Sequence, residues 1–501
     1  MRTSVQAAMS AINLYSEYFL GLIISLTIAR NLTTDDYGVY SSIIWISGLV
    51  TLAINSGLGI NATKFIAEFT KRDPKSLPAI VAYFWRIQHI RILIVSAIAL
   101  VILLSSYGNT NIEPWLLTTL FICAVIKADY MFRMAVFKGV KKFDVIAKTS
   151  VIANPFNIAL VLLCAYLDAT LNNFILVYCV ACLIYGVSAR LYTKQLPSRQ
   201  WDNGIVQEHK KRIVIQMLSA TGIVFFGTLI FKQSQVLVLE KSDFFTEAGF
   251  FNIAFLLSTA AITLVPGIYQ EILLPKITDA VENGDVKSQV EQAERYLITL
   301  SMAVAIPMVI YADVIIEVLY GERYQEAAFS LQIMVVLKAI MTLNQGANLT
   351  LISHDKQFDM VKVNAGMFVF AMILSLFIVP FMGLTGALIV YGTLVFILLF
   401  SYSMLARSCK YKMISVNNLL RIIVPALIST GAPLIINQFL SGILSSIIGS
   451  ISFVVLYFYL LFIFRGYDRS VVYILKQIEP KSPKKIKVYI NWGIKQLMNT
   501  K

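Results

Sequence analysis

Long apolar stretches alternate with short polar loops along the whole chain, and this alternation constrains the fold more than any other feature. A helix of about 20 apolar residues crosses the core of a bilayer. Hydrophobic residues make up 58% of the chain and charged residues only 14%, so lipid is expected to be its solvent. Fourteen membrane-spanning helices are predicted, at about 8–30, 39–62, 83–106, 113–136, 145–167, 171–192, 213–239, 247–273, 295–319, 327–352, 359–381, 384–408, 417–440 and 442–464.

The charges of the loops test this count. Lys and Arg gather in every second loop, whereas the loops between them contain only Arg30, Lys241 and Arg323. Cytoplasmic loops of membrane proteins carry this excess of positive charge. The pattern predicts that both termini are cytoplasmic. The net charge of +14 is then explained by orientation and by contact with anionic headgroups, and no nucleic-acid partner is expected.

A short pattern occurs twice. DYGVY at 36–40 returns 211 residues later as EAGFF at 247–251, and KKFD at 141–144 returns after 215 residues as KQFD at 356–359. These offsets indicate a duplicated half of roughly 200 residues, and related halves of a transporter usually enclose the substrate site. The predicted organisation is an N-terminal six-helix lobe at 1–193, a cytoplasmic linker at 194–212, a C-terminal six-helix lobe at 213–409, an extra helix pair at 410–464 and a basic cytoplasmic tail at 465–501.

Four of the predicted spans carry polar residues at intervals of three and four, which places these residues on one side of each helix. We hypothesise that the polar sides meet in a hydrated central cavity, although they would equally hold helices together. Ionisable groups at membrane depth usually face such a cavity or a partner. The stripes are Gln6, Ser10, Asn13 and Glu17; Gly48, Thr51 and Asn55; Thr221, Thr228, Lys232 and Gln235; and Lys338, Thr342, Gln345 and Asn348.

Two carboxylates lie inside the predicted first lobe, Glu17 and Asp129, and they are the candidates for coupling to H⁺ or Na⁺. For Glu17 a cavity role and a salt bridge remain open. Asp129 and Lys127 are interpreted as paired with each other or as reaching the membrane boundary. Neither a metal site nor a cofactor is predicted, because Cys179 and Cys182 form a CxxC inside an apolar run without a supporting histidine or cysteine pair.

Several motifs resemble those of the polysaccharide transporter family, which contains the Wzx-type O-antigen and capsule flippases. ARNLTTDDYGVY at 29–40 is similar to the family's Arg-x-Leu-x-x-x-Asp/Glu-Tyr-Gly-x-Tyr signature. NSGLG at 55–59 and KFIAE at 64–68 resemble the stretch that follows it. The family is related to the lipid II flippases and to the multidrug and toxin extruders, all of them within one exporter superfamily.

The resemblance implies an all-α polytopic membrane protein with two pseudo-symmetric six-helix lobes around a V-shaped central cavity. Relatives move an undecaprenyl-diphosphate-linked oligosaccharide, an O-antigen or capsule repeat unit, from the inner to the outer leaflet of the bacterial inner membrane. The span pair at 417–464 would be the two C-terminal helices that some members carry. Membrane lipid and other polysaccharide-assembly proteins would be the partners. Many relatives have an aspartate where Gln235 stands here, which leaves that position without an ion-coupling role.

A diphosphate needs counter-charge in the membrane, and its sugars need hydrogen-bonding walls. Lys232 and Lys338 are predicted to be the headgroup cations. Two roles are open for Arg30, which would hold the outer gate or receive the diphosphate after flipping. The residues predicted to face the sugars are Asn55, Gln235 and Gln345.

Two other functions compete with a flippase. An ion-coupled multidrug antiporter would share the fold but would need a cluster of carboxylates. A glycan polymerase or ligase usually has a long outer loop with arginines and histidines, whereas the outer loops here run to about 10 residues. We therefore expect a transporter and no enzyme, with no catalytic residues. A phosphate-cradling glycine-rich loop is also missing from the sequence, so ATP is not expected to supply energy within this chain.

Overall fold

The computed structural model describes residues 20–105, 114–168, 170–196, 198–263, 286–354, 356–409 and 411–464, and within these ranges the chain is helical without β-strands. Ten helices in these ranges are long and apolar enough to cross a membrane, or eleven if one bent pair counts as a span. The structure is therefore that of an all-α multi-pass membrane protein. The predicted tail at 465–501 and Glu17 lie outside the described residues.

The fourteen predicted spans are consistent with these helices. The predicted spans at 359–381 and 384–408 correspond to the two halves of α16 (Gln357–Arg407), which are separated by a kink with non-helical backbone angles at Gly383. The predicted first span is described from its middle onward, as the helix Leu20–Asn31. The helix α5 (Pro114–Gly139) matches the predicted fourth span, although it is not among the ten helices counted above.

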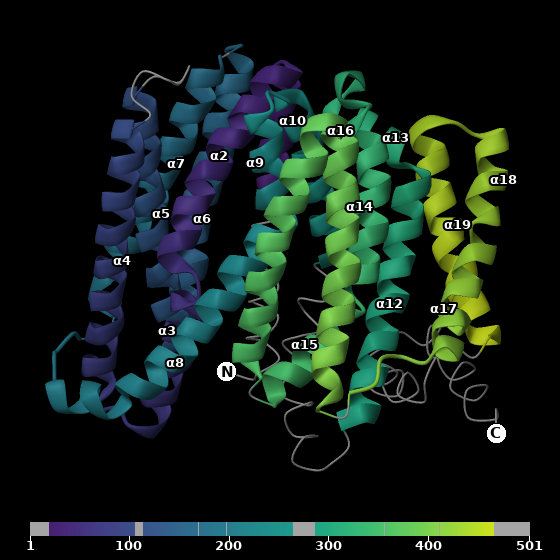
Figure 1. The fold of residues 1–501 in the computed structure, drawn as a ribbon. Coiled ribbons are helices and arrows are strands. Elements are labelled where there is room, and N and C mark those ends of the chain that lie inside the picture. The colour runs from purple at the N-terminus through teal and green to yellow at the C-terminus, as the bar shows by residue number, and fades with distance from the viewer. Residues whose placement is uncertain are drawn as a thin grey trace, which may run out of the picture.

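The N-terminal lobe (N-lobe) consists of the helix Leu20–Asn31 and six further helices. Within it α5 packs against α2, α3 and α7, and α6 packs against α7. Figure 1 shows these helices side by side in purple and blue. Their bounds are α2 Thr34–Asn55, α3 Leu58–Arg72, α4 Leu77–Ser105, α5 Pro114–Gly139, α6 Phe143–Tyr166 and α7 Leu171–Leu191.

The C-terminal lobe (C-lobe) repeats this order with more breaks. Two π-helical turns, η2 (Leu229–Gln233) and η3 (Thr259–Thr263), interrupt its first two spans. The helix α8 begins inside the predicted linker and crosses from the N-lobe to the C-lobe (Figure 1). The α-helices of the C-lobe are α8 Asn203–Thr228, α9 Ser234–Lys241, α10 Phe245–Ser258, α12 Val286–Ile310, α13 Ala312–Tyr320, α14 Ala327–Met341, α15 Asn344–Ser353 and α16 Gln357–Arg407.

Three last helices, α17 (Val416–Ser429), α18 (Gly431–Phe439) and α19 (Gly442–Ile463), form the extra pair of spans. α17 and α19 pack against α12. The segment before α17 is anchored by the buried carboxylate of Glu294, which accepts hydrogen bonds from the Tyr411 hydroxyl and from the Ile414 backbone N–H at 3.0 Å. The pair therefore lies at the side of the C-lobe, as Figure 1 shows.

The helix bundle has an upper end and a lower end. The upper end is where α2 and α10 begin, and the lower end is where α3 ends and α8 begins (Figure 1). Many large apolar side chains are exposed on the helices, among them Phe377, Phe381 and Phe439. Exposed apolar surface on this scale marks contact with a membrane or a partner, and the length of the helices favours the membrane.

Candidate functional site

The two copies of the repeated motif meet at the upper end of the molecule. α2 carries Gly38 and α10 carries Gly249, and the two helices pack against each other. A Cβ atom on Gly38 would overlap the backbone carbonyl of Phe245, and one on Gly249 would lie 3.5 Å from the Gly38 Cα. Small residues allow membrane helices to approach this closely. The motif that revealed the duplication thus forms the contact between the two lobes.

Polar contacts strengthen this junction. Arg30, in the last turn of the helix Leu20–Asn31, donates to the backbone carbonyls of Leu319 (2.8 Å) and Val318 in the last turn of α13. The hydroxyl of Tyr324 donates to the Ala29 carbonyl at 3.0 Å. A cation at the carboxyl end of a helix is favourable because the helix dipole is negative there. In this conformation Arg30 therefore holds the helix Leu20–Asn31 of the N-lobe against α13 of the C-lobe.

Nearer the lower end, the lobes meet at the break between α2 and α3. Arg91 of α4 donates to the Ser56 carbonyl at 2.7 Å and to the Thr221 hydroxyl at 3.0 Å. Gly57 has a φ of +68°, and a Cβ atom on it would overlap the Thr221 backbone nitrogen. The α2–α3 break therefore fits closely against α8.

A lysine lies near the middle of the C-lobe spans. Lys338 of α14 is 9% exposed. Its Nζ lies 4.2 Å from the centroid of the Phe255 ring and 5.9 Å from that of the Tyr391 ring. Cation–π contacts of this kind compensate a desolvated charge. The structure thus places Lys338, one of the two predicted headgroup cations, in an aromatic setting between α10 and α16.

Lys127 of α5 has the same setting in the N-lobe. Its Nζ lies 5.2 Å from the centroid of the Tyr178 ring, and it donates to the Tyr178 hydroxyl at 3.4 Å. Lys127 and Lys338 are 211 residues apart, and Tyr178 and Tyr391 are 213 residues apart. Both offsets agree with the repeated motifs. The 211-residue offset of the repeated motifs already relates these two lysines in the sequence, whereas the polar stripes contain only Lys338.

The proposed partner of Lys127 binds elsewhere. Asp129 forms ion pairs with Arg133 at 2.9 Å and with Arg190 at 3.6 Å, and no ion pair joins it to Lys127 among the described residues. Lys127 and Asp129 are two residues apart on a helix, a spacing that does not bring side chains together. The interpretation of these two residues as a pair is therefore wrong.

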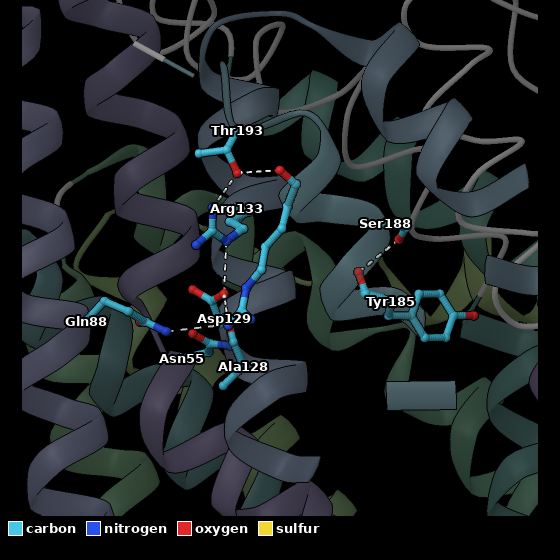
Figure 2. Close-up of polar contacts among 9 residues, drawn as sticks. Asn55, Gln88, Ala128, Asp129, Arg133, Tyr185, Ser188 and Thr193 are labelled. Atoms are coloured by element: carbon cyan, nitrogen blue, oxygen red, sulfur yellow. Dashed lines mark hydrogen bonds and ion pairs between the residues drawn. The ribbon is translucent and has the colours of Figure 1, made fainter. Parts of the chain in front are cut away.

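Figure 2 shows the surroundings of Asp129, with Arg133 and Thr193 on one side of it. On the other side the amides of Asn55 and Gln88 both donate to the Ala128 carbonyl, at 3.0 and 3.5 Å. The structure thus brings together two predicted residues, Asn55 and Asp129. Asp129 is already neutralised by two arginines, an arrangement unlike that of a carboxylate that binds and releases an ion.

The other predicted residues are separate from this group. Gln235 is fully buried and donates to the Ile230 carbonyl at 3.2 Å, so its amide faces protein in this conformation. Gln345 is half-buried at the beginning of α15. Lys232 lies in the π-helical turn η2, but its side chain lies outside what the structure describes. Within the described part of the chain, no three His, Cys, Asp or Glu side chains gather to hold a metal ion.

Comparisons with known proteins agree with this architecture. The family model described as "Polysaccharide biosynthesis protein" matches residues 27–329. No curated protein sequence matches the chain. A structure of the lipid II flippase MurJ in an inward closed conformation is similar with a TM-score of 0.70 at 12% identity, over 91% of this chain and 98% of that one.

Multidrug transporters of the MATE family have the same fold. An inward-facing structure from the MOP superfamily is similar with a TM-score of 0.62 at 12% identity, over 78% of this chain and 94% of that one. The Vibrio cholerae transporter VcmN, as its D35N mutant, gives a TM-score of 0.55 at 14% identity, over 81% of this chain and 98% of that one. At such identities these likenesses establish the fold alone.

Proposed function

Because the chain belongs to the family of polysaccharide biosynthesis proteins, we propose that it is a flippase that translocates an undecaprenyl-diphosphate-linked oligosaccharide, without hydrolysing it. The observation that carries the proposal is that a polysaccharide-family chain has, over 91% of its length, the fold of a structure named as a lipid II flippase. The family and the fold are those of a membrane transporter.

Lys338 and Lys127 are the cations that we propose for the diphosphate, together with Lys232. An uncompensated lysine at membrane depth costs about 2.5–3.5 kcal/mol on insertion scales. In this conformation Phe255, Tyr391 and Tyr178 offset that cost by cation–π contacts. A diphosphate that enters between the lobes would replace the rings as the partner of each lysine. The prenyl tail would stay in the bilayer throughout.

Orientation follows from the loop charges. The described lower end carries many basic residues, and we propose that it faces the cytoplasm of a bacterial cell, with the membrane being the inner membrane. In this conformation the lobes are joined at the upper end by α2 and α10. Transport then requires that this junction separates after the substrate has entered from the lower side, as alternating access demands.

Substitution of the two lysines tests the proposal. Lys338→Ala and Lys127→Ala should each lower surface glycan about tenfold or more, because a charge-assisted bond to a phosphate contributes about 1.5–3 kcal/mol. Lys138→Ala is the matched control, since this lysine is exposed at the lower end of α5. Glycan is measured in cells with equal amounts of each variant in the membrane. Unchanged glycan in both lysine variants would remove these residues from the mechanism.

The MATE likeness keeps a multidrug antiporter as the second candidate. That function needs a carboxylate free to exchange H⁺ or Na⁺, and Asp129 is held by two arginines. Susceptibility to cationic drugs separates the candidates. A flippase predicts unchanged susceptibility in cells without the protein, and an antiporter predicts increased susceptibility.

A further inference from the structure

Three arginines and one carboxylate lie together at the lower end of the N-lobe. Asp129 pairs with both Arg133 and Arg190. The third arginine, Arg199 in the segment between α7 and α8, forms no hydrogen bond or ion pair among the described residues. One negative charge therefore faces three positive charges, and two of the positive charges are not neutralised.

An indole ring holds two of these guanidinium groups near each other. The Cζ of Arg199 lies 3.7 Å from the centroid of the Trp85 ring, and the Cζ of Arg133 lies 4.7 Å from it. Trp85 is 4% exposed, and its Nε1 has no hydrogen-bond partner among the described residues. Burial, and then the charge of Arg133, lower the pKa of Arg199 from its ordinary value. Like charges held at this spacing repel each other unless an anion lies between them.

The donors of the group are arranged for an oxygen-rich anion. Arg133 donates to Asp129 and, at 3.2 Å, to the Thr193 hydroxyl, which fixes the plane of its guanidinium (Figure 2). Arg199 is exposed and donates no hydrogen bond to another described residue. Planar guanidinium groups bind phosphate through paired hydrogen bonds. The group is therefore preorganised for phosphate.

The position of the group indicates a phosphate that belongs to a lipid. Leu93 of α4 and Leu191 of α7 are 71% and 67% exposed on the adjacent helix surfaces. Arg86 stacks on Trp201, which is 43% exposed, with its Cζ 4.8 Å from the ring centroid. Tryptophan is enriched at the level of the lipid headgroups. The arginines thus lie where the phosphates of one leaflet lie.

We propose that Arg133, Arg190 and Arg199 form, around Trp85, a binding site for the phosphate of an anionic lipid at the lower end of the N-lobe. Two sources share this chemistry, a bilayer phospholipid and a prenyl diphosphate. The inference rests on the proposed flippase function only if the source is the prenyl diphosphate.

Native mass spectrometry of the full-length protein in detergent tests the site, with phosphatidylglycerol and undecaprenyl diphosphate as anionic probes and phosphatidylethanolamine as the zwitterionic control. Arg199→Gln should weaken the binding of an anionic probe about tenfold, because it removes a charged donor pair. Arg421→Gln, the same change at an exposed arginine on α17, should leave it unchanged. Arg199→Lys keeps the charge without the planar donors and should weaken binding by a smaller factor.

The two probes identify the source. If Arg199→Gln loses binding of phosphatidylglycerol alone, the site is assigned to a bilayer phospholipid. If it loses binding of undecaprenyl diphosphate alone, the site is assigned to a flippase substrate. If Arg199→Gln binds both probes as wild type does, while its apparent melting temperature is unchanged, the site is overturned. This result would leave the lysine test of the flippase function untouched, because that test measures surface glycan.

Discussion

Lys338 and Lys127 show how the fold accommodates single charged residues inside its membrane-spanning helices. Each is a cation near the middle of a span, and each lies beside the ring of a tyrosine from another helix of its lobe. The tyrosine hydroxyl in the N-lobe also bonds Ser47 at 2.9 Å. Ser258, 211 residues after Ser47, occupies the corresponding place in the C-lobe sequence. The duplication has thus preserved a small polar group as well as helices.

The sequence predicted some of these residues and missed others for definable reasons. Lys338 was predicted from its polar stripe. Gln235 was assigned to a stripe that assumes 3.6 residues per turn, but the π-helical turn at 229–233 lies between Thr228 and Gln235 and changes the register of the helix. Lys127 is predicted to pair with Asp129 or to reach the membrane boundary, and the pairing is wrong because Asp129 pairs with Arg133 and Arg190. Such errors arise because a stripe describes one helix and not its neighbours.

Gly57 provides a prediction at the same scale. Gly57→Ala should destabilise the protein by at least about 1–2 kcal/mol, because a left-handed backbone is costly for an L-residue, and because the new Cβ would overlap the Thr221 backbone. The apparent melting temperature in detergent measures this.

Gly48→Ala is the control for Gly57→Ala. No atom lies within 4 Å of the position of its new Cβ, and alanine is favoured over glycine inside a helix by about 0.5–1 kcal/mol. Its melting temperature should therefore stay equal or rise. Equal melting temperatures for the two variants would contradict the close fit of the α2–α3 break against α8.

At the scale of elements, the sequence predicted the breaks between spans but not those inside a span. Apolar length and loop charge located the spans and separated the two halves of α16 next to Gly383, where φ is +51°. They do not report that α12 and α13 bend by 75°. At Gly383 the reason for the break is tertiary, since the carboxylate of Glu247 from α10 accepts from the Leu384 backbone N–H. A contact between residues that are 137 positions apart leaves no pattern in the local sequence.

The α2–α10 junction gives a prediction for the elements. Gly38→Val should keep the upper end from closing, because its side chain would occupy the place of the Phe245 carbonyl. When the upper end is closed, as in this structure, the hydroxyl of Thr246 donates a hydrogen bond to the carboxylate of Asp35. A cysteine at position 246 should therefore react severalfold faster with a membrane-impermeant maleimide when Gly38→Val is also present.

Thr246→Cys alone and the parent chain are the controls for this labelling. The natural cysteines are buried, apart from the partly exposed Cys164, so the parent chain should react slowly. If Gly38→Val leaves the rate at position 246 unchanged, the contact between the repeated motifs does not close the upper end.

At the scale of the whole molecule, the sequence predicted two lobes and the structure adds how they are joined. The repeated motifs indicated a duplication, and their packing against each other at Gly38 and Gly249 became visible only in three dimensions. α8 contacts α3 and α4 of the N-lobe and α16 of the C-lobe, so it links the two lobes mechanically as well as covalently. This arrangement suits lobes that rock against each other around a site between them.

The location of lipid-linked oligosaccharide in cells depleted of this protein tests the central claim most directly. The proposed flippase function predicts that the undecaprenyl-linked glycan accumulates with its sugars facing the cytoplasm and that surface glycan falls. Wild-type protein should restore both the normal location of the lipid-linked glycan and the normal amount of surface glycan. The Lys338→Ala variant, at equal abundance in the membrane, should restore neither. Lipid-linked glycan that still reaches the outer leaflet at the normal rate in depleted cells would contradict the proposed flippase function.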